Sequence, residues 1–313
     1  MNQSALVLGT RGSALALRQA NLVRERLEAL GLSIRIRVIR TKGDRVLDVP
    51  LSEIEDKGLF TAELDLALLD GTIQLAVHSL KDLPTRLSEG IVLAAVPKRE
   101  DPRDAFVAHA AFTGGLSDVP EGGTLATASL RRRSQLKAWR PDLRVVPVRG
   151  NVDTRVKKLD AGTWSGIVLA AAGLKRLGME RRITELLDPD VMLSAVGQGA
   201  LAVVCAEEDT ATRAFLRETI HDPPSFNAVI AERAFLHRLQ GGCTVPVGAR
   251  AIDDARGTLE LDGCVADPDG TVVVRGRIDG RTEDGERLGI DLAEELLARG
   301  ADEILDAIRQ KTP

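Results

Sequence analysis

Short apolar runs alternate with longer segments of helical periodicity over the first hundred residues. Residues 5–8, 34–39 and 75–77 are predicted to be strands, and residues 13–30 and 61–69 are predicted to be helices. Strands that alternate with helices form βαβ units, which bring successive strands into one parallel sheet. This part of the chain is therefore predicted to form a doubly wound, mostly parallel α/β sheet.

A second run of the same kind follows a polar stretch rich in proline and charge. Its predicted elements are, in chain order, a strand near residue 125, a helix at 129–139, a strand at 143–148, a helix at 152–159 and a strand at 166–170. A glycine-rich segment then leads into an apolar strand at 201–205, which we expect to return to the first sheet.

Two crossings between two α/β regions predict a pair of lobes joined by hinges. We place the crossings near 97–104 and 194–199. The predicted boundaries are residues 1–98 with 200–218 for the first lobe and residues 99–199 for the second. Two such lobes around a cleft have the architecture of periplasmic binding proteins, which close on a ligand.

The last third of the chain has a different pattern. A predicted helix at 226–239 precedes three alternating strands, with a hairpin turn at 267–270, and helices at 292–299 and 301–308 end the chain. At 313 residues the chain is too long for one ordinary core. Residues 219–313 are therefore predicted to form a separate C-terminal α+β domain.

Composition excludes several classes of protein. A net charge of −4 disfavours a nucleic-acid partner, and no apolar run is long enough to span a membrane. The first residues lack the pattern of a secretory signal. The three cysteines have no Cys-x-x-Cys spacing, which predicts reduced thiols and no metal site. We therefore expect a cytoplasmic protein without a membrane partner.

Arginine recurs where predicted strands lead into helices. One such arginine is more often a solvated surface residue, and a Gly turn by itself is as readily structural as functional. Repetition at four junctions favours a pocket for a small polyanion, because the guanidinium fork suits carboxylates. The polar residues at these junctions are Arg11 and Ser13; Ser129, Arg131 and Arg132; Arg149 and Arg155; and Lys175 and Arg176.

The segment His78–Pro84 follows the predicted strand 75–77. In open α/β sheets ligands bind outside the carboxyl ends of strands, so this segment is a candidate site. Lys81 and Asp82 offer a cation and a candidate acid or base. The residues alone leave open whether both are solvated loop charges, and whether His78 is a structural residue or a catalyst.

Cys243 is the cysteine most suited to covalent chemistry. It follows two glycines, which let the backbone turn tightly and let a bulky group approach the thiol. Cys205 lies in an apolar strand and is predicted to be in the core, whereas Cys264 lies in an alternating strand.

These segments together resemble the porphobilinogen deaminase (hydroxymethylbilane synthase) family. They occur in the family's order from residue 10 to residue 246, so the resemblance covers most of the chain. The matching motifs are Thr10-Arg11-Gly12-Ser13, Lys57-Gly58-Leu59-Phe60, His78-Ser79-Leu80-Lys81-Asp82, Arg99-Glu100-Asp101-Pro102-Arg103-Asp104, Ser129-Leu130-Arg131-Arg132, Arg149-Gly150-Asn151, Ala172-Gly173-Leu174-Lys175-Arg176, Ala195-Val196-Gly197-Gln198-Gly199 and Gly241-Gly242-Cys243.

The resemblance implies a transferase that condenses four porphobilinogen molecules, with loss of ammonia, into the linear tetrapyrrole hydroxymethylbilane. It implies a dipyrromethane cofactor joined to Cys243 through a thioether, and a monomeric enzyme. Asp82 is then the catalytic residue, facing the pyrrole nitrogens. The implied cofactor-binding residues are Lys81, Asp82, Ser129, Arg131 and Arg132, and the implied substrate-binding residues are Arg11, Ser13, Arg149, Arg155 and Arg176.

Two other hypotheses fit parts of the sequence. A two-lobed solute-binding module without catalysis fits the paired lobes but leaves the C-terminal domain and Gly241-Gly242-Cys243 unexplained. A nucleotide-dependent enzyme would use the Gly9–Ser13 turn to bind phosphate. That turn has neither the Walker nor the Rossmann spacing, which disfavours a nucleotide.

Overall fold

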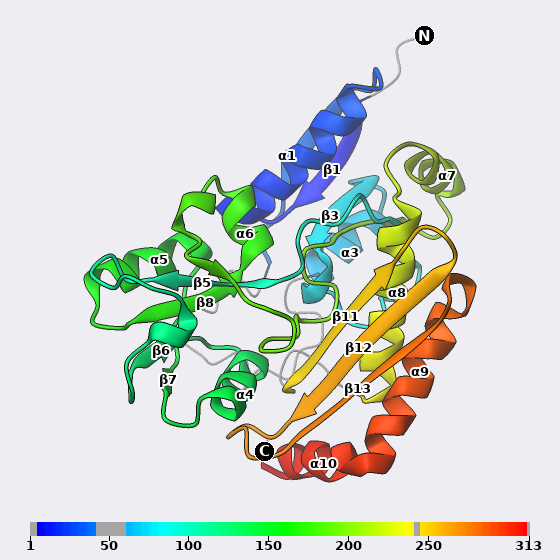
Figure 1. The fold of residues 1–313 in the computed structure, drawn as a ribbon. Coiled ribbons are helices and arrows are strands. Elements are labelled where there is room, and N and C mark those ends of the chain that lie inside the picture. The colour runs from blue at the N-terminus through cyan, green and yellow to red at the C-terminus, as the bar shows by residue number, and fades with distance from the viewer. Residues whose placement is uncertain (1–4, 42–60, 241–244, 312–313) are drawn as a thin grey trace. The chain divides into compact units, whose positions relative to one another are not determined.

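The structure, a computed structural model, describes residues 5–41, 61–240 and 245–311 (Figure 1). The chain divides into two units, residues 1–100 with 200–226, and residues 101–199 with 227–313. The division into three domains made from the sequence stays a prediction. Within the described residues, no helix combines the length and the apolar character needed to cross a membrane.

The first unit contains a five-stranded sheet in the order β2-β1-β3-β10-β4. β1, β2 and β3 are parallel, whereas β10 runs antiparallel to both β3 and β4. Its elements are β1 (Leu6–Thr10), α1 (Ala14–Glu28), β2 (Ile34–Val38), α3 (Ala62–Leu69), β3 (Leu75–Ser79), the 3-10 helix η2 (Leu80–Asp82), β4 (Ile91–Ala95), β10 (Leu201–Ala206) and α7 (Thr210–Thr219).

Buried apolar residues of α1 and α7 pack against one face of this sheet. Ala20, Val23 and Leu27 of α1 share a core with Leu8 of β1 and Leu75 of β3. Their spacing along α1 repeats every three or four residues, which places them on one side of the helix. The helix therefore forms because its apolar side is covered by the sheet.

The second unit contains a sheet in the order β7-β6-β8-β5-β9. β6, β7 and β8 are parallel, and β5 runs antiparallel to β8 and β9. Both five-stranded sheets thus place their one reversed strand fourth. The elements are β5 (Asp104–Ala108), η3 (Leu116–Asp118), β6 (Thr124–Ala126), α4 (Leu130–Trp139), β7 (Arg144–Val146), α5 (Val152–Ala161), β8 (Gly166–Ala170), α6 (Ala171–Arg176), η4 (Glu180–Arg182) and β9 (Glu185–Leu186).

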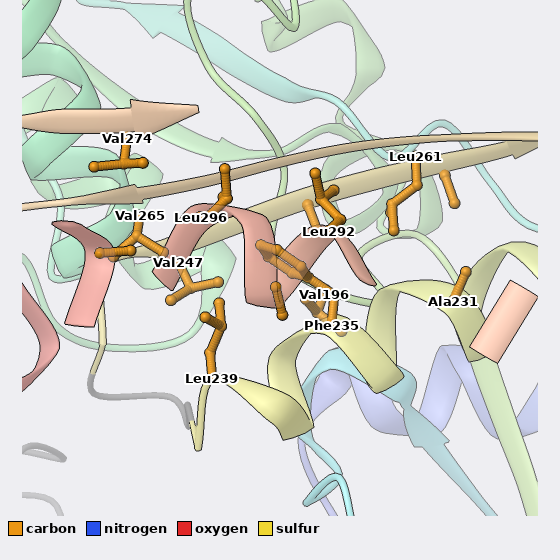
Figure 2. Packing of buried hydrophobic residues seen from close by; sticks show 14 of the residues in the cluster. Val196, Ala231, Phe235, Leu239, Val247, Leu261, Val265, Val274, Leu292 and Leu296 are labelled. Carbon is orange, nitrogen blue, oxygen red and sulfur yellow. The ribbon is translucent and has the colours of Figure 1, made fainter. Parts of the chain in front are cut away.

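The second unit also contains a three-stranded antiparallel sheet with helices against it (Figure 1). Figure 2 shows Phe235 and Leu292 between the helices and the strand that carries Leu261. A Cβ on Gly263 would lie 2.6 Å from the Phe235 ring, so a side chain there would displace the ring. The elements are α8 (Pro223–Arg238), β11 (Val247–Asp253), β12 (Thr258–Ala266), β13 (Val273–Arg281), η5 (Thr282–Asp284), α9 (Gly285–Leu296), the π-helix η6 (Leu297–Ala301) and α10 (Asp302–Lys311).

The observed elements confirm the predicted fold class of mostly parallel α/β sheets with an antiparallel α+β region. Two of the differences from the predicted elements concern where an element begins. Residues 104–108 form β5, although residue 104 had been included in a crossing segment. α9 begins at Gly285, seven residues before the predicted helix at 292–299. The charged residues Glu286, Arg287 and Asp291 obscure its apolar side in the sequence; that side includes Leu288, Leu292 and Leu296.

Candidate functional site

Arg11 and Ser13 lie between β1 and α1 in the first unit. Ser13 is the N-cap of α1, and its Oγ accepts a hydrogen bond from the backbone N–H of Ala16 at 3.3 Å. Thr10 Oγ1 donates to the Ala16 carbonyl at 3.2 Å. The predicted helix start at Ser13 is therefore confirmed, and it fixes the turn that carries Arg11.

The end of β3 is held from two sides. Ser79 Oγ accepts a hydrogen bond from Gln19 Nε2 at 2.7 Å, and the Leu80 N–H donates to the Ala200 carbonyl at 3.0 Å. Asp82 then lies at the end of η2 and is exposed. Its carboxylate makes no hydrogen bond or ion pair within the part of the chain that the structure describes.

His78 lies one residue before the end of β3 and is 7% exposed. Burial lowers the pKa of its imidazole from 6.5 to about 4, and the nearby charge of Arg11 acts in the same direction. Its Nε2 is buried and has no hydrogen-bond partner in the described residues. His78 is therefore neutral near pH 7, which argues against a role as an imidazolium.

The first turn of α4 carries three of the predicted site residues in the second unit. Ser129 is the N-cap, and its Oγ accepts from the Arg132 N–H at 3.4 Å. Arg131 and Arg132 are buried and both point their guanidiniums at Asp104, the first residue of β5. The distances to the Asp104 carboxylate are 2.7 Å from Arg131 Nη1, and 3.0 and 2.7 Å from Nε and Nη2 of Arg132.

Asp104 is completely buried, yet it remains a carboxylate. Burial by itself would raise its pKa, but the charges of Arg131 and Arg132 outweigh that effect and hold the pKa well below its ordinary value. Gln198 Nε2 also donates to it, at 3.0 Å. The same amide donates to the Pro102 carbonyl at 2.8 Å, so Gln198 links its own segment to residues 102–104.

The remaining predicted arginines follow β7 and β8 and are half-buried. Arg155 Nε donates to the Gly150 carbonyl at 2.7 Å, and Arg176 Nη2 donates to the Gly199 carbonyl at 2.6 Å. Gly150 has φ +110°, which favours glycine at the turn next to Arg149. Because β7, β6 and β8 are neighbours, the second unit collects Ser129, Arg131, Arg132, Arg149, Arg155 and Arg176 at strand ends.

Sequence reasoning missed two buried carboxylates of the second unit, of which only Asp104 contacts the site arginines. Asp104 begins an apolar strand, and a carboxylate in that position is itself a signal that a cation lies nearby. Glu232 of α8 is also fully buried, and it accepts from the N–H groups of Gly197 and Ala251 at 2.6 and 2.8 Å. Nothing in the sequence around Glu232 indicates these partners.

The two described cysteines are poorly suited to act as nucleophiles. Cys205 lies in the core of the first unit, where burial raises the pKa of its thiol to about 11. Cys264 is also buried, and burial raises the pKa of its thiol. Cys243 lies outside the described residues, as do the motif residues 57–60 and 241–242.

Family models match almost the whole chain. The model described as "Porphobilinogen deaminase, dipyromethane cofactor binding domain" matches residues 6–214, and "Porphobilinogen deaminase, C-terminal domain" matches residues 226–298. A curated porphobilinogen deaminase of Rubrobacter xylanophilus is 51% identical over 309 residues, covering 98% of this chain and 99% of its own. That of Syntrophotalea carbinolica is 49% identical over 310 residues, covering 98% and 97%.

The chain is also similar to solved structures, but at a much lower sequence identity. A periplasmic substrate-binding protein of an ABC transporter from Coxiella burnetii is 14% identical, with a TM-score of 0.42. The match covers 73% of this chain and 96% of that one.

Proposed function

Because the chain belongs to the porphobilinogen deaminase family, we propose that it condenses four porphobilinogen molecules into hydroxymethylbilane on a dipyrromethane joined to Cys243. Ammonia leaves at each addition, and one water supplies the hydroxyl group when the finished tetrapyrrole is released from the primer. The observation that carries the proposed site is Asp82, an exposed carboxylate at a strand end with no partner among the described residues.

Asp82 is the catalytic residue of this proposal. When bound, the dipyrromethane supplies the primer whose free pyrrole carbon is extended. As ammonia leaves the substrate, positive charge develops on a pyrrole nitrogen, and a fixed carboxylate nearby stabilises that charge. Because no side chain of the described residues engages Asp82, its two oxygens are available to accept pyrrole N–H groups and to move a proton.

The arginines hold the carboxylates of cofactor and substrate. Each pyrrole ring of the family's substrate carries an acetate and a propionate, and guanidiniums bind such groups in pairs of parallel hydrogen bonds. Lys81, Asp82, Ser129, Arg131 and Arg132 contact the cofactor in this proposal. The substrate is held by Arg11, Ser13, Arg149, Arg155 and Arg176.

Cys243 is the attachment point of the cofactor. The other two thiols, Cys205 and Cys264, are buried with raised pKa values, so neither offers a reactive thiolate. The intact mass of the purified protein should exceed the sequence mass by two linked pyrrole units. Cys243→Ala should remove this increment and abolish turnover of porphobilinogen, whereas Cys205→Ala, the matched control, should keep both. An unmodified wild-type protein that turns over porphobilinogen would contradict the assignment.

The protein works as a cytoplasmic monomer, with porphobilinogen as its partner and neither nucleic acid nor a membrane. Both described cysteines are unpaired thiols, which suits a reducing compartment. The net charge of −4 does not suit binding to nucleic acid. Light scattering of the purified protein checks the monomer. A solute-binding module without catalysis is not favoured, because the family models extend through the C-terminal region.

A further inference from the structure

Asp104, Arg131 and Arg132 form a buried cluster with a surplus of one positive charge. One carboxylate faces two guanidiniums, and the three residues are 0%, 4% and 5% exposed. In the described part of the chain, no other carboxylate pairs with either arginine. A buried charge without a partner is unfavourable, so this cluster is suited to receive one anionic group from outside the protein.

The two arginines use their nitrogens differently. Arg132 donates through Nε and Nη2 to Asp104 and through Nη1 to the Val168 carbonyl at 3.0 Å. Arg131 donates only through Nη1, to Asp104 at 2.7 Å and to the Leu193 carbonyl at 2.5 Å.

The other two nitrogens of Arg131 form an open edge. Its Nε and Nη2 make no hydrogen bond to any described residue, and neither atom is completely buried. Two adjacent N–H groups on one side of a guanidinium are the arrangement that binds a carboxylate through two parallel hydrogen bonds.

We infer that Asp104 is a positioning residue for the dipyrromethane cofactor. It anchors Arg131 so that the Nε and Nη2 edge binds one cofactor carboxylate, and Arg132 braces Asp104 from the other side. Asp104 itself cannot contact that carboxylate, because it is fully buried and carries the same charge. The inference rests on the proposed function and assigns different roles to two arginines that the sequence treated alike.

Two explanations of the role of Asp104, one based on the net charge of the cluster and one based on the positioning of Arg131, predict opposite results for Asp104→Asn. If only the summed charge mattered, removing a negative charge would strengthen the binding of an anion and speed cofactor loading. If Asp104 positions Arg131, the freed guanidinium takes several orientations and loading slows. Misplacement of a binding group by about 1 Å costs about 10²-fold in rate. We therefore expect loading to slow by about that factor.

Loading is measured as the fraction of protein that carries the adduct mass, followed over time as protein without the adduct is incubated with porphobilinogen. Glu232→Gln is the matched control, because Glu232 is an equally buried carboxylate of the same unit that accepts hydrogen bonds from the backbone N–H groups of Gly197 and Ala251. It should lower the melting temperature as Asp104→Asn does, yet load at the wild-type rate.

Asp104→Glu tests the inference should Asp104→Asn not fold. It keeps the charge but moves the carboxylate by one methylene, so loading should be slower than in the wild type and faster than in any folded Asp104→Asn. Wild-type loading in the folded Asp104 variants would overturn the inference, as would equal slowing in Glu232→Gln. A wild-type protein that never acquires the adduct would instead overturn the proposed function.

Discussion

Two aspartates, one in each unit, illustrate opposite uses of a carboxylate. Asp82 follows β3, is exposed and has no partner among the described residues. Asp104 begins β5, is fully buried and accepts hydrogen bonds from Arg131, Arg132 and Gln198. The described residues supply both hydrogen-bond donors and counter-charges to Asp104, and they supply neither to the carboxylate of Asp82.

This difference separates residues that hold the site from residues that act in it. Removing a buried, fully paired charge leaves its partners unpaired, which lowers the stability of the fold. It also changes the positions of the side chains that were paired with it. Removing an exposed, unpaired charge leaves no protein group unsatisfied, so the effect falls on whatever binds from outside. The contrast predicts which property each substitution changes.

The largest effect is expected for Asp82→Asn. The amide keeps the shape of the side chain but loses the charge that faces the pyrrole nitrogens. Turnover should fall by about 10²–10⁴-fold, the range for a positioned acid or base. Substrate affinity should change little, because the arginines that hold the substrate carboxylates remain. Single-turnover rates and binding measured on the same preparation check both expectations.

The stability of Asp82→Asn shows whether Asp82 acts in catalysis or only holds its loop in place. A carboxylate that only held its loop in place would leave a less stable variant with nearly normal turnover. Because Asp82 has no partner among the described residues, we expect the free energy of unfolding to change by no more than about 0.5 kcal/mol. A clear drop in melting temperature with normal turnover would break the comparison with Asp104.

Asp104→Asn should instead be strongly destabilising. It leaves two buried guanidiniums without a counter-charge, and breaking a buried pair from one side typically costs about 3–5 kcal/mol. Since the folded state holds the pKa of Asp104 below its ordinary value, the charge stabilises the fold above that value, and the stabilisation is lost as pH falls below it. Urea unfolding of wild type and variant near neutral pH measures the difference, and equal stabilities would contradict it.

His78 is a buried titratable residue of the first unit, and it affects the stability of the fold over a different pH range from Asp104. Its pKa is about 4 in the folded protein and 6.5 when exposed, so the unfolded chain binds the proton more readily between these values. The free energy of unfolding should therefore fall by about 3 kcal/mol as pH drops from about 7 to about 4. His78→Gln should lose this part of the pH dependence. An unchanged dependence would show that His78 is not buried as a neutral group.

The contrast also explains what could be predicted from the sequence. The family, the enzyme class, the cofactor and the fold class are confirmed, because they depend on ordered motifs and on the alternation of strands and helices. The cap at Ser13 was equally accessible, since its partner Ala16 lies three residues away. The assigned roles of the site residues stay predictions.

The hydrogen bonds that hold Arg131 and Arg132 could not be predicted from the sequence in the same way. Asp104 meets Arg131, Arg132 and Gln198 across 27, 28 and 94 residues of chain. Such pairings depend on the order of strands in the sheet, and in particular on β5 lying beside β8. Sequence reasoning treated Arg131 and Arg132 as equal ligands because only the hydrogen bonds of their separate nitrogens distinguish them.

The smallest effect is expected at Ser13, where one side chain is assigned two tasks. Its Oγ caps α1, and the proposed site also uses it to bind a substrate carboxylate. Ser13→Ala should lower the free energy of unfolding by about 1 kcal/mol, the usual value of an N-cap. Ser13→Asp restores the cap and suits the helix dipole, so stability should return. Its negative charge repels the substrate carboxylate, so KM for porphobilinogen should rise above that of Ser13→Ala. If Ser13→Asp instead restores both stability and KM, then Ser13 only caps the helix, and the first unit binds substrate without it.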